Sequence, residues 1–122
     1  VESIQWNIEN EIKDLSKIDI GLYPVYDDKW SIGKSGLKAL QYMALGIPPI
    51  CSNVGTNKDI INNFQNGFLA NDENDWFEYL LKLIDSEDLR SKIGINAKKT
   101  IVDYYSTDVI GSQYLKVIES VI

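Results

Sequence analysis

The chain has 122 residues, of which 44% are hydrophobic and 25% are charged, as in an ordinary globular protein of one domain or part of one. Its net charge of −6 argues against nucleic acid as a partner, because basic surfaces bind phosphate backbones. With no histidine and one cysteine, it lacks the usual zinc ligands and the commonest general base. We therefore expect no metal site.

The single cysteine, Cys51, lies in an apolar run and has no partner for an internal disulfide, which fits a reducing setting. We expect it to fill space in the core rather than to act as a nucleophile. No apolar run is long enough for a membrane span, and no signal peptide is visible. We expect the full-length protein in the cytoplasm, either free or peripheral to a membrane. The chain begins at Val1 without a methionine, which indicates a piece of a longer protein.

The first third of the chain predicts two strands and a helix. Alternating apolar residues favour a short strand over residues 1–6, and helical spacing after Asn7 favours a helix over 7–15. Residues 18–25 read as a second strand, and residues 26–33 as a polar, acidic loop.

A central helix is predicted over residues 35–45, with Gly46 just beyond its end and a buried strand over 49–52. A turn over 53–57 and a short helix capped by Asn57 come next. The core face of the central helix is expected to consist of Leu37, Leu40, Met43 and Ala44.

The last part of the chain predicts a strand over residues 68–70 and then three helices. The helices are expected to start at Asn74 or Asp75, at Ser86 and at Ser106. The third helix carries an apolar stripe of Ile110, Tyr114, Val117 and Val121.

Strands that alternate with helices predict an α/β fold with a mostly parallel sheet. Ligands of such sheets bind outside the carboxyl ends of the strands. The loop over residues 26–34 and the turn over 53–57 both follow strand ends, so we expect them on the same rim.

The start of the central helix has the ingredients of an anion site. Gly33 and Gly36 bracket Lys34 and Ser35 there, which brings together free backbone amides, the positive end of the helix dipole and a lysine. Glycine at these positions also lets a ligand approach the backbone closely. We expect the anion to be the diphosphate of a nucleotide sugar.

Neighbouring polar side chains allow two interpretations each. Lys34, Lys38 and Gln41 share one helix face, which is either a stripe along a ligand or a solvated surface. The two aspartates at 27–28 are either a functional carboxylate pair or solvated loop acids. Trp30 either stacks on a base or sugar or clamps the loop to the body.

The sequence resembles the C-terminal part of a group 1 glycosyltransferase (family four), a retaining enzyme of the GT-B fold. The resemblance implies that residues 1–122 form a partial nucleotide-sugar-binding domain. Its fold would be an incomplete Rossmann-like parallel sheet with flanking helices and three C-terminal helices. The motifs that carry the resemblance are Trp6, Glu11, Leu15, Asp19-Ile-Gly21, Pro24, Trp30, Gly33-Lys34, Gly36, Lys38, Gln41-Tyr-Met-Ala, Gly46, Pro48, Ser52-Asn-Val-Gly55, Asn57, Asn66-Gly-Phe-Leu-Ala70 and Asp75-Trp76.

In this family two glutamates flank the amides that hold the diphosphate, one contacting the donor sugar and the other the ribose. Gly33 stands at the position of the sugar-holding glutamate, so the contact there has no carboxylate. Gln41 replaces the ribose glutamate and can still bond a hydroxyl. The resemblance implies a donor site of Gly33, Lys34, Ser35, Gly36, Leu37 and Gln41, in which Lys34 and the Ser35–Leu37 amides face the diphosphate.

The resemblance also implies what the chain lacks. Two earlier strands of the domain, expected between the strands over 1–6 and 18–25, and the N-terminal acceptor domain lie outside it. We therefore expect no catalytic residue in this chain, no resident cofactor beyond the donor substrate, and no activity of the isolated chain. An open sheet edge or the last helix is expected to favour self-association.

Two non-enzymatic alternatives remain open at this point. A receiver-type regulatory domain has a similar length and α/β layout, and the acids at 27–28 could imitate its acidic cluster. The expected phosphoacceptor aspartate and late lysine are missing after the strands over 49–52 and 68–70. An interaction module that uses the three C-terminal helices is the other alternative.

Overall fold

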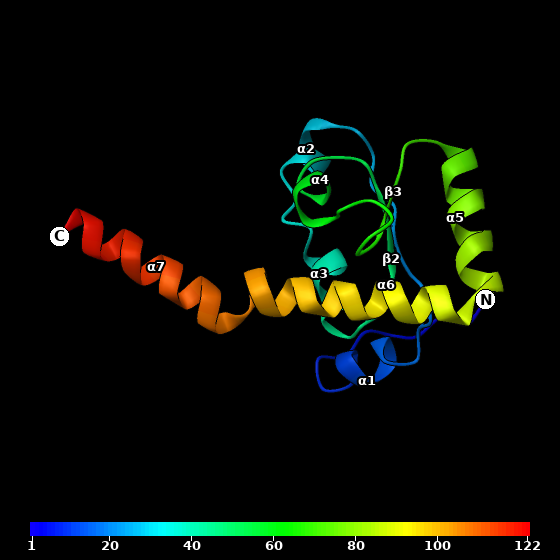
Figure 1. The fold of residues 1–122 in the computed structure, drawn as a ribbon, viewed down its shortest axis with the longest axis horizontal. Coiled ribbons are helices and arrows are strands. Elements are labelled where there is room, and N and C mark those ends of the chain that lie inside the picture. The colour runs from blue at the N-terminus through cyan, green and yellow to red at the C-terminus, as the bar shows by residue number, and fades with distance from the viewer.

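The computed structural model describes residues 1–122 as a three-stranded parallel sheet with helices around it (Figure 1). The strands β1 (Gly21–Tyr23), β2 (Pro49–Ser52) and β3 (Phe68–Ala70) lie in that order. Leu22 is in register with Ile50, and Ile50 with Phe68. The predicted α/β fold with a parallel sheet is confirmed, and it matches part of a Rossmann-like domain.

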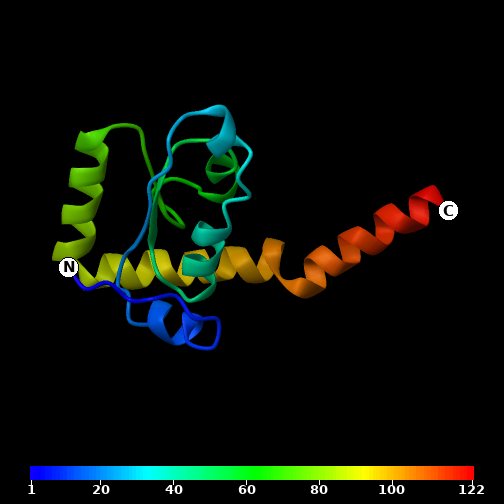
Figure 2. The ribbon, with the colours of Figure 1, turned by 180° about the vertical axis from the view of Figure 1, so that it is seen from behind.

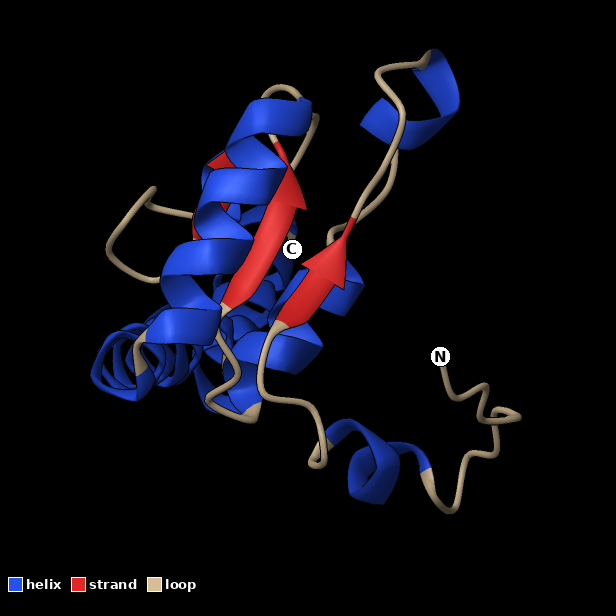
Figure 3. Cartoon of the chain, turned by 90° about the vertical axis from the view of Figure 1, so that its right-hand side faces the viewer, coloured by secondary structure: helices blue, strands red, loops and turns tan.

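The central and last strands are buried along their whole length, as in a parallel sheet covered on both faces. Successive side chains point to opposite faces, so Cys51 and Leu69 join one core cluster and Ile50 and Phe68 the other. β1 pairs with β2 alone, and its Leu22 is 42% exposed. The sheet therefore has an open edge at β1 (Figure 3).

The predicted strand over residues 1–6 is wrong, because this segment is irregular and exposed. A strand needs a neighbour to complete its hydrogen-bond ladder, and none lies beside these residues. The predicted helix is shorter than expected, as α1 covers only Glu11–Leu15. Asn7 does not cap it; its side chain accepts a hydrogen bond from the Glu9 amide at 2.8 Å.

The predicted loop over residues 26–33 contains a short helix, α2 (Lys29–Ile32). Asp28 caps it, since its carboxylate accepts a hydrogen bond from the Ser31 amide at 2.7 Å. This hydrogen bond, helped by the charge of Lys34, lowers the pKa of Asp28. Asp28 is therefore a capping residue, which does not support the interpretation of residues 27–28 as a functional carboxylate pair.

The central helix α3 spans Leu37–Ala44, and its buried face differs from the predicted one. Met43 is buried and Leu40 half-buried as expected, but Leu37 and Ala44 are exposed. Ala39 and Tyr42 are buried instead. The Tyr42 ring lies over β1 because Gly21 has no side chain there, and a Cβ on Gly21 would sit 2.4 Å from the ring.

The short helix α4 (Asn57–Ile60) begins after Thr56, so Asn57 is not its N-cap. The buried Asn57 side chain instead donates a hydrogen bond to the Ser52 carbonyl at 3.0 Å. This contact ties the end of β2 to the start of α4. Because asparagine is common at N-caps, the sequence predicted Asn57 there, whereas the N-cap is the preceding residue, Thr56.

Three helices follow β3, as predicted. The helix α5 (Glu73–Asp85) is capped by Asp72, not by Asn74 or Asp75. Ser86 caps α6 (Glu87–Thr100), and Ser106 caps α7 (Thr107–Val121), both as expected. A π-helical turn, η1 (Ile101–Tyr105), joins α6 to α7.

The helix α6 runs across the amino ends of the strands (Figure 1). Its Gly94 packs directly on Gly46, and a Cβ on Gly94 would lie 2.1 Å from the Gly46 carbonyl oxygen. The helix α7 instead extends away from the body (Figure 2) and has no buried residue. None of the helices is both long and apolar enough to cross a membrane.

Candidate functional site

The loop between α2 and α3 lies against the turn between β2 and α4. The Thr56 hydroxyl donates a hydrogen bond to the Lys34 carbonyl. A Cβ on Gly55 would sit 3.0 Å from the Ile32 carbonyl oxygen, so the two backbones are in close contact. The prediction that both segments share the rim at the carboxyl ends of the strands is confirmed.

Three consecutive backbone amides at the start of α3, those of Ser35, Gly36 and Leu37, donate no hydrogen bond within the chain. Such amides carry the positive end of the helix dipole. Lys34 precedes them, is exposed and forms no ion pair. An anion at this point could accept hydrogen bonds from the amides beside a positive charge.

The two glycines of this loop have different structural roles. Gly36 has a φ of 70°, in the left-handed region, and a Cβ there would lie 2.5 Å from the Ile60 side chain. Backbone shape and the contact with Ile60 therefore require glycine, whatever approaches from solvent. Gly33 has an ordinary φ of −78° as the C-cap of α2, and the nearest atom to its Cβ position is 3.5 Å away.

The polar face of α3 contacts Glu11, a residue that is part of the family resemblance but for which the sequence predicted no role. Glu11 of α1 accepts a hydrogen bond from Gln41 Nε2 at 3.2 Å, and Lys38 Nζ lies 3.7 Å from the same carboxylate. The other amide atom of Gln41, Oε1, is buried and has no hydrogen-bond partner. No local pattern could have indicated the role of Glu11, because its partners lie in another helix.

The structure separates the six predicted donor-site residues into two groups. Gly33 to Leu37 form a continuous, mostly exposed loop and helix start on the rim, whereas Gln41 lies one turn further along α3 and faces Glu11. None of the six lines the cavities of about 650, 440 and 430 Å³. Gly33 to Leu37 therefore form an open surface on this part of the molecule.

A cavity of about 430 Å³ lies beside this loop, at the carboxyl ends of all three strands. Asp27 and Trp76 line it, together with the hydrogen-bonded side chains of Asn53 and Asn71. Trp30 is 81% exposed, which contradicts its interpretation as a clamp. Neither this cavity nor any other place gathers three His, Cys, Asp or Glu side chains that could hold a metal ion.

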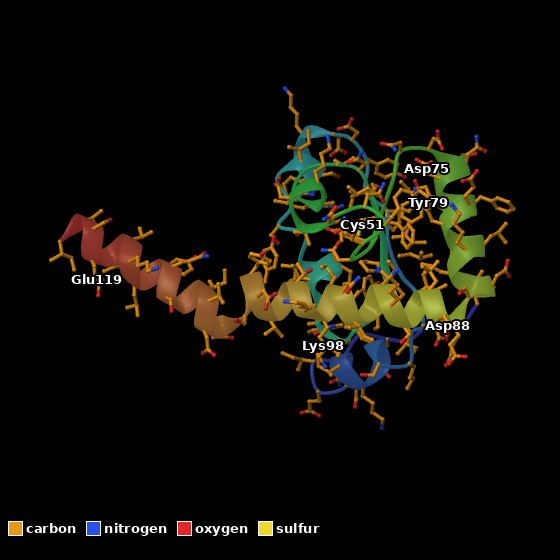
Figure 4. The ribbon with its side chains drawn as sticks, in the orientation of Figure 1. Cys51, Asp75, Tyr79, Asp88, Lys98 and Glu119 are labelled. Carbon is orange, nitrogen blue, oxygen red and sulfur yellow. The ribbon has the colours of Figure 1, made fainter.

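The thiol of the only cysteine is not accessible to reactants in solvent. Cys51 lies within the body of the domain (Figure 4) and is fully buried. Burial raises the pKa of its thiol to about 12, so the thiolate is scarce near neutral pH. The prediction that Cys51 fills space in the core is confirmed.

Comparison with known proteins agrees with these observations. The family model described as glycosyl transferases group 1 matches residues 4–100. A GDP-Man:Man(3)GlcNAc(2)-PP-Dol alpha-1,2-mannosyltransferase of Dictyostelium discoideum is 26% identical over 109 residues, covering 88% of this chain and 20% of the relative. An uncharacterized glycosyltransferase of Methanocaldococcus jannaschii is 39% identical over 66 residues, covering 52% of this chain and 19% of the relative.

The chain thus spans about a fifth of the length of these two relatives. The family match covers most of its residues, including β1, α3, β2, β3 and the loop that leads into α3. The chain therefore belongs to the group 1 glycosyltransferases.

Proposed function

We propose that Lys34 and the backbone amides of residues 35–37 hold the diphosphate of a nucleotide-sugar donor in a full-length glycosyltransferase. The observation that carries this proposal is the set of three unpartnered amides at the start of α3, next to the exposed Lys34. Charge-assisted hydrogen bonds from such groups are among the stronger ones in proteins. The same groups would stabilise the negative charge that builds up on the departing diphosphate.

We assign Gln41 to the ribose of the donor. Its Oε1 atom is an unused hydrogen-bond acceptor, and its Nε2 atom is held by Glu11. Because Oε1 is buried, a ribose hydroxyl reaches it only after the surrounding side chains shift. Gly33 offers no carboxylate to the sugar, so other parts of the protein would supply that contact.

The remaining parts of the proposal concern the whole protein. We propose that residues 1–122 are part of its C-terminal donor-binding domain, that it transfers the sugar with retention of configuration, and that an N-terminal domain holds the acceptor. The name of the Dictyostelium relative, which specifies a GDP-linked sugar, supports a nucleoside diphosphate sugar as donor. Family membership favours this function over a receiver-type or purely interacting domain.

The test is donor binding by the full-length protein with Lys34→Ala. Loss of one charged hydrogen-bond donor is expected to weaken binding of GDP or UDP about tenfold, measured by calorimetry. Lys92→Ala is the control, since Lys92 is an exposed lysine on α6 that also forms no ion pair. Nucleotide affinity and turnover equal to those of the control would rule out the role of Lys34.

A further inference from the structure

A groove between α4, the end of α6 and α7 contains none of the proposed donor-site residues. It consists of two adjoining cavities, of about 650 and 320 Å³. They share Asn62, Asn66, Thr100 and Tyr104, so they form one continuous depression. Its walls are α4 with the segment after it, the end of α6 with η1, and the first turns of α7.

The π-helical turn η1 creates one wall of this groove. It ends α6, and Ser106 then caps α7 in an extended backbone conformation. This change of direction brings Tyr104 and Tyr105 of η1 and Gln113 of α7 to the same cavity. Single π-turns within helices occur frequently at functional sites.

The floor of the groove is fixed by Asn66. This buried side chain accepts a hydrogen bond from the Asn62 amide at 2.7 Å and donates to Thr100 Oγ1 at 3.0 Å and to the Ile60 carbonyl at 3.3 Å. A buried amide with all these bonds holds both walls in place. The groove therefore exists before any ligand arrives.

The lining combines polar side chains with three isoleucines and carries no net charge. Its charged side chains are two lysines and two aspartates, and Lys99 is already paired with Asp103. The other polar lining groups are amides and hydroxyls, which both donate and accept hydrogen bonds. They are the side chains of Asn62, Gln65, Asn66, Asn96, Thr100, Tyr104, Tyr105 and Gln113.

Several of these groups have unused hydrogen-bonding capacity. The side chains of Tyr104, Tyr105 and Gln113 make no hydrogen bond within the chain. Burial, and to a lesser extent the charge of Asp59, raises the pKa of Tyr105, so its hydroxyl keeps its proton and can donate. Tyr104 is 65% exposed and offers a ring face to solvent.

We propose that this groove binds a neutral carbohydrate chain. The balanced charges favour neither an anion nor a cation, and the many amides and hydroxyls do not suit a lipid. A sugar matches the lining because its hydroxyls pair with amides and its apolar ring faces pack on tyrosine. None of the donor-loop residues lines the groove, although Ile60 in its wall lies beside Gly36. The groove would therefore hold a part of a glycan that does not react.

The experiment titrates the ¹⁵N-labelled 122-residue chain with α-1,2-linked mannotriose and follows side-chain amide signals by NMR. The expected result is saturable shifts of the Asn62, Asn96 and Gln113 side-chain amides. Tyr104→Ala should weaken binding roughly twofold to tenfold, because an aromatic contact is worth about 0.5–1.5 kcal/mol. Gln113→Ala should weaken it as well.

Tyr114→Ala is the matched control, because Tyr114 is 67% exposed on α7 but does not line the groove. Its binding should equal that of the unmodified chain, and circular dichroism should show that all variants fold. Absence of saturable shifts at these amides with 20 mM mannotriose overturns the proposal. Equal affinities of the Tyr104 and Tyr114 variants, or shifts confined to residues 33–37, overturn it too.

Discussion

The body of the domain and the helix α7 carry similar apolar stripes but use them differently. In the body, Tyr79 and Leu83 of α5 and Ile93 and Ala97 of α6 are buried against the sheet. In α7 the stripe that contains Val117 remains exposed. The difference shows that helical spacing identifies a face that can be buried, whereas burial requires a second surface at the right distance.

The first way to sharpen this comparison is to remove one leucine from each region. Leu83→Ala in α5 empties a fully buried position, and we expect it to lower the free energy of unfolding by about 2–5 kcal/mol. Leu115→Ala in α7, where the side chain is 61% exposed, should change it by less than about 0.5 kcal/mol. Urea denaturation of both variants measures the difference. Equal losses would mean that α7 packs on the body in solution.

The same comparison can be made with one glycine from each region. Gly94→Ala forces a Cβ against the Gly46 carbonyl, and such overpacking should cost about 1–3 kcal/mol. Gly111 in α7 has no atom within 4 Å of its Cβ position. Gly111→Ala should therefore stabilise α7 by up to about 1 kcal/mol. Thermal melts should show opposite shifts, and shifts of the same sign would contradict the structure.

A third pair of variants compares the two glycines of the α2–α3 loop. Gly36→Ala places a side chain at a φ of 70° and against Ile60, so we expect a loss of at least about 1–2 kcal/mol. Gly33→Ala has room at an ordinary φ and should change stability by less than about 0.5 kcal/mol. Chemical denaturation distinguishes them. If neither substitution lowers the free energy of unfolding, the loop adopts another conformation.

The smallest expected effect concerns association of the isolated chain. We propose that copies associate weakly through the uncovered stripe of α7, because an exposed apolar face favours contact with another one. Val117→Asp should then reduce the average mass at high concentration in sedimentation equilibrium. Leu22→Asp at the centre of β1 tests the alternative contact, the open sheet edge. If the unmodified chain and both variants are monomers at every concentration, neither the α7 stripe nor the sheet edge mediates association.

The elements that local sequence determines were predicted well. The strands over 49–52 and 68–70 have the predicted bounds, since short apolar runs between turn residues leave little choice. The caps Ser86 and Ser106 are also confirmed, because a cap bonds to amides a few residues away. The predicted family and the parallel α/β fold are confirmed by the comparisons and the structure together.

The errors concern features that depend on distant residues. The prediction of the buried face of α3 was wrong because Tyr42 packs over Gly21, which lies in the strand β1. Asn57 was misplaced because its side chain bonds to Ser52. The sequence correctly predicted that the donor loop and the turn over 53–57 share one rim. It did not predict the contact of Gln41 with Glu11, because the two residues lie in different helices. The binding roles of Lys34 to Leu37 and Gln41 stay predictions.

The contacts that require glycine at position 36 have a consequence for binding. Ile60 holds this residue from one side, and the Thr56 hydroxyl anchors the preceding Lys34 carbonyl. The amides that precede α3 are thus oriented before any anion arrives. Because folding has already restricted this loop, an anion that accepts hydrogen bonds from it loses little affinity to loop ordering. Even a small anion such as inorganic pyrophosphate could therefore bind there without the rest of a nucleotide.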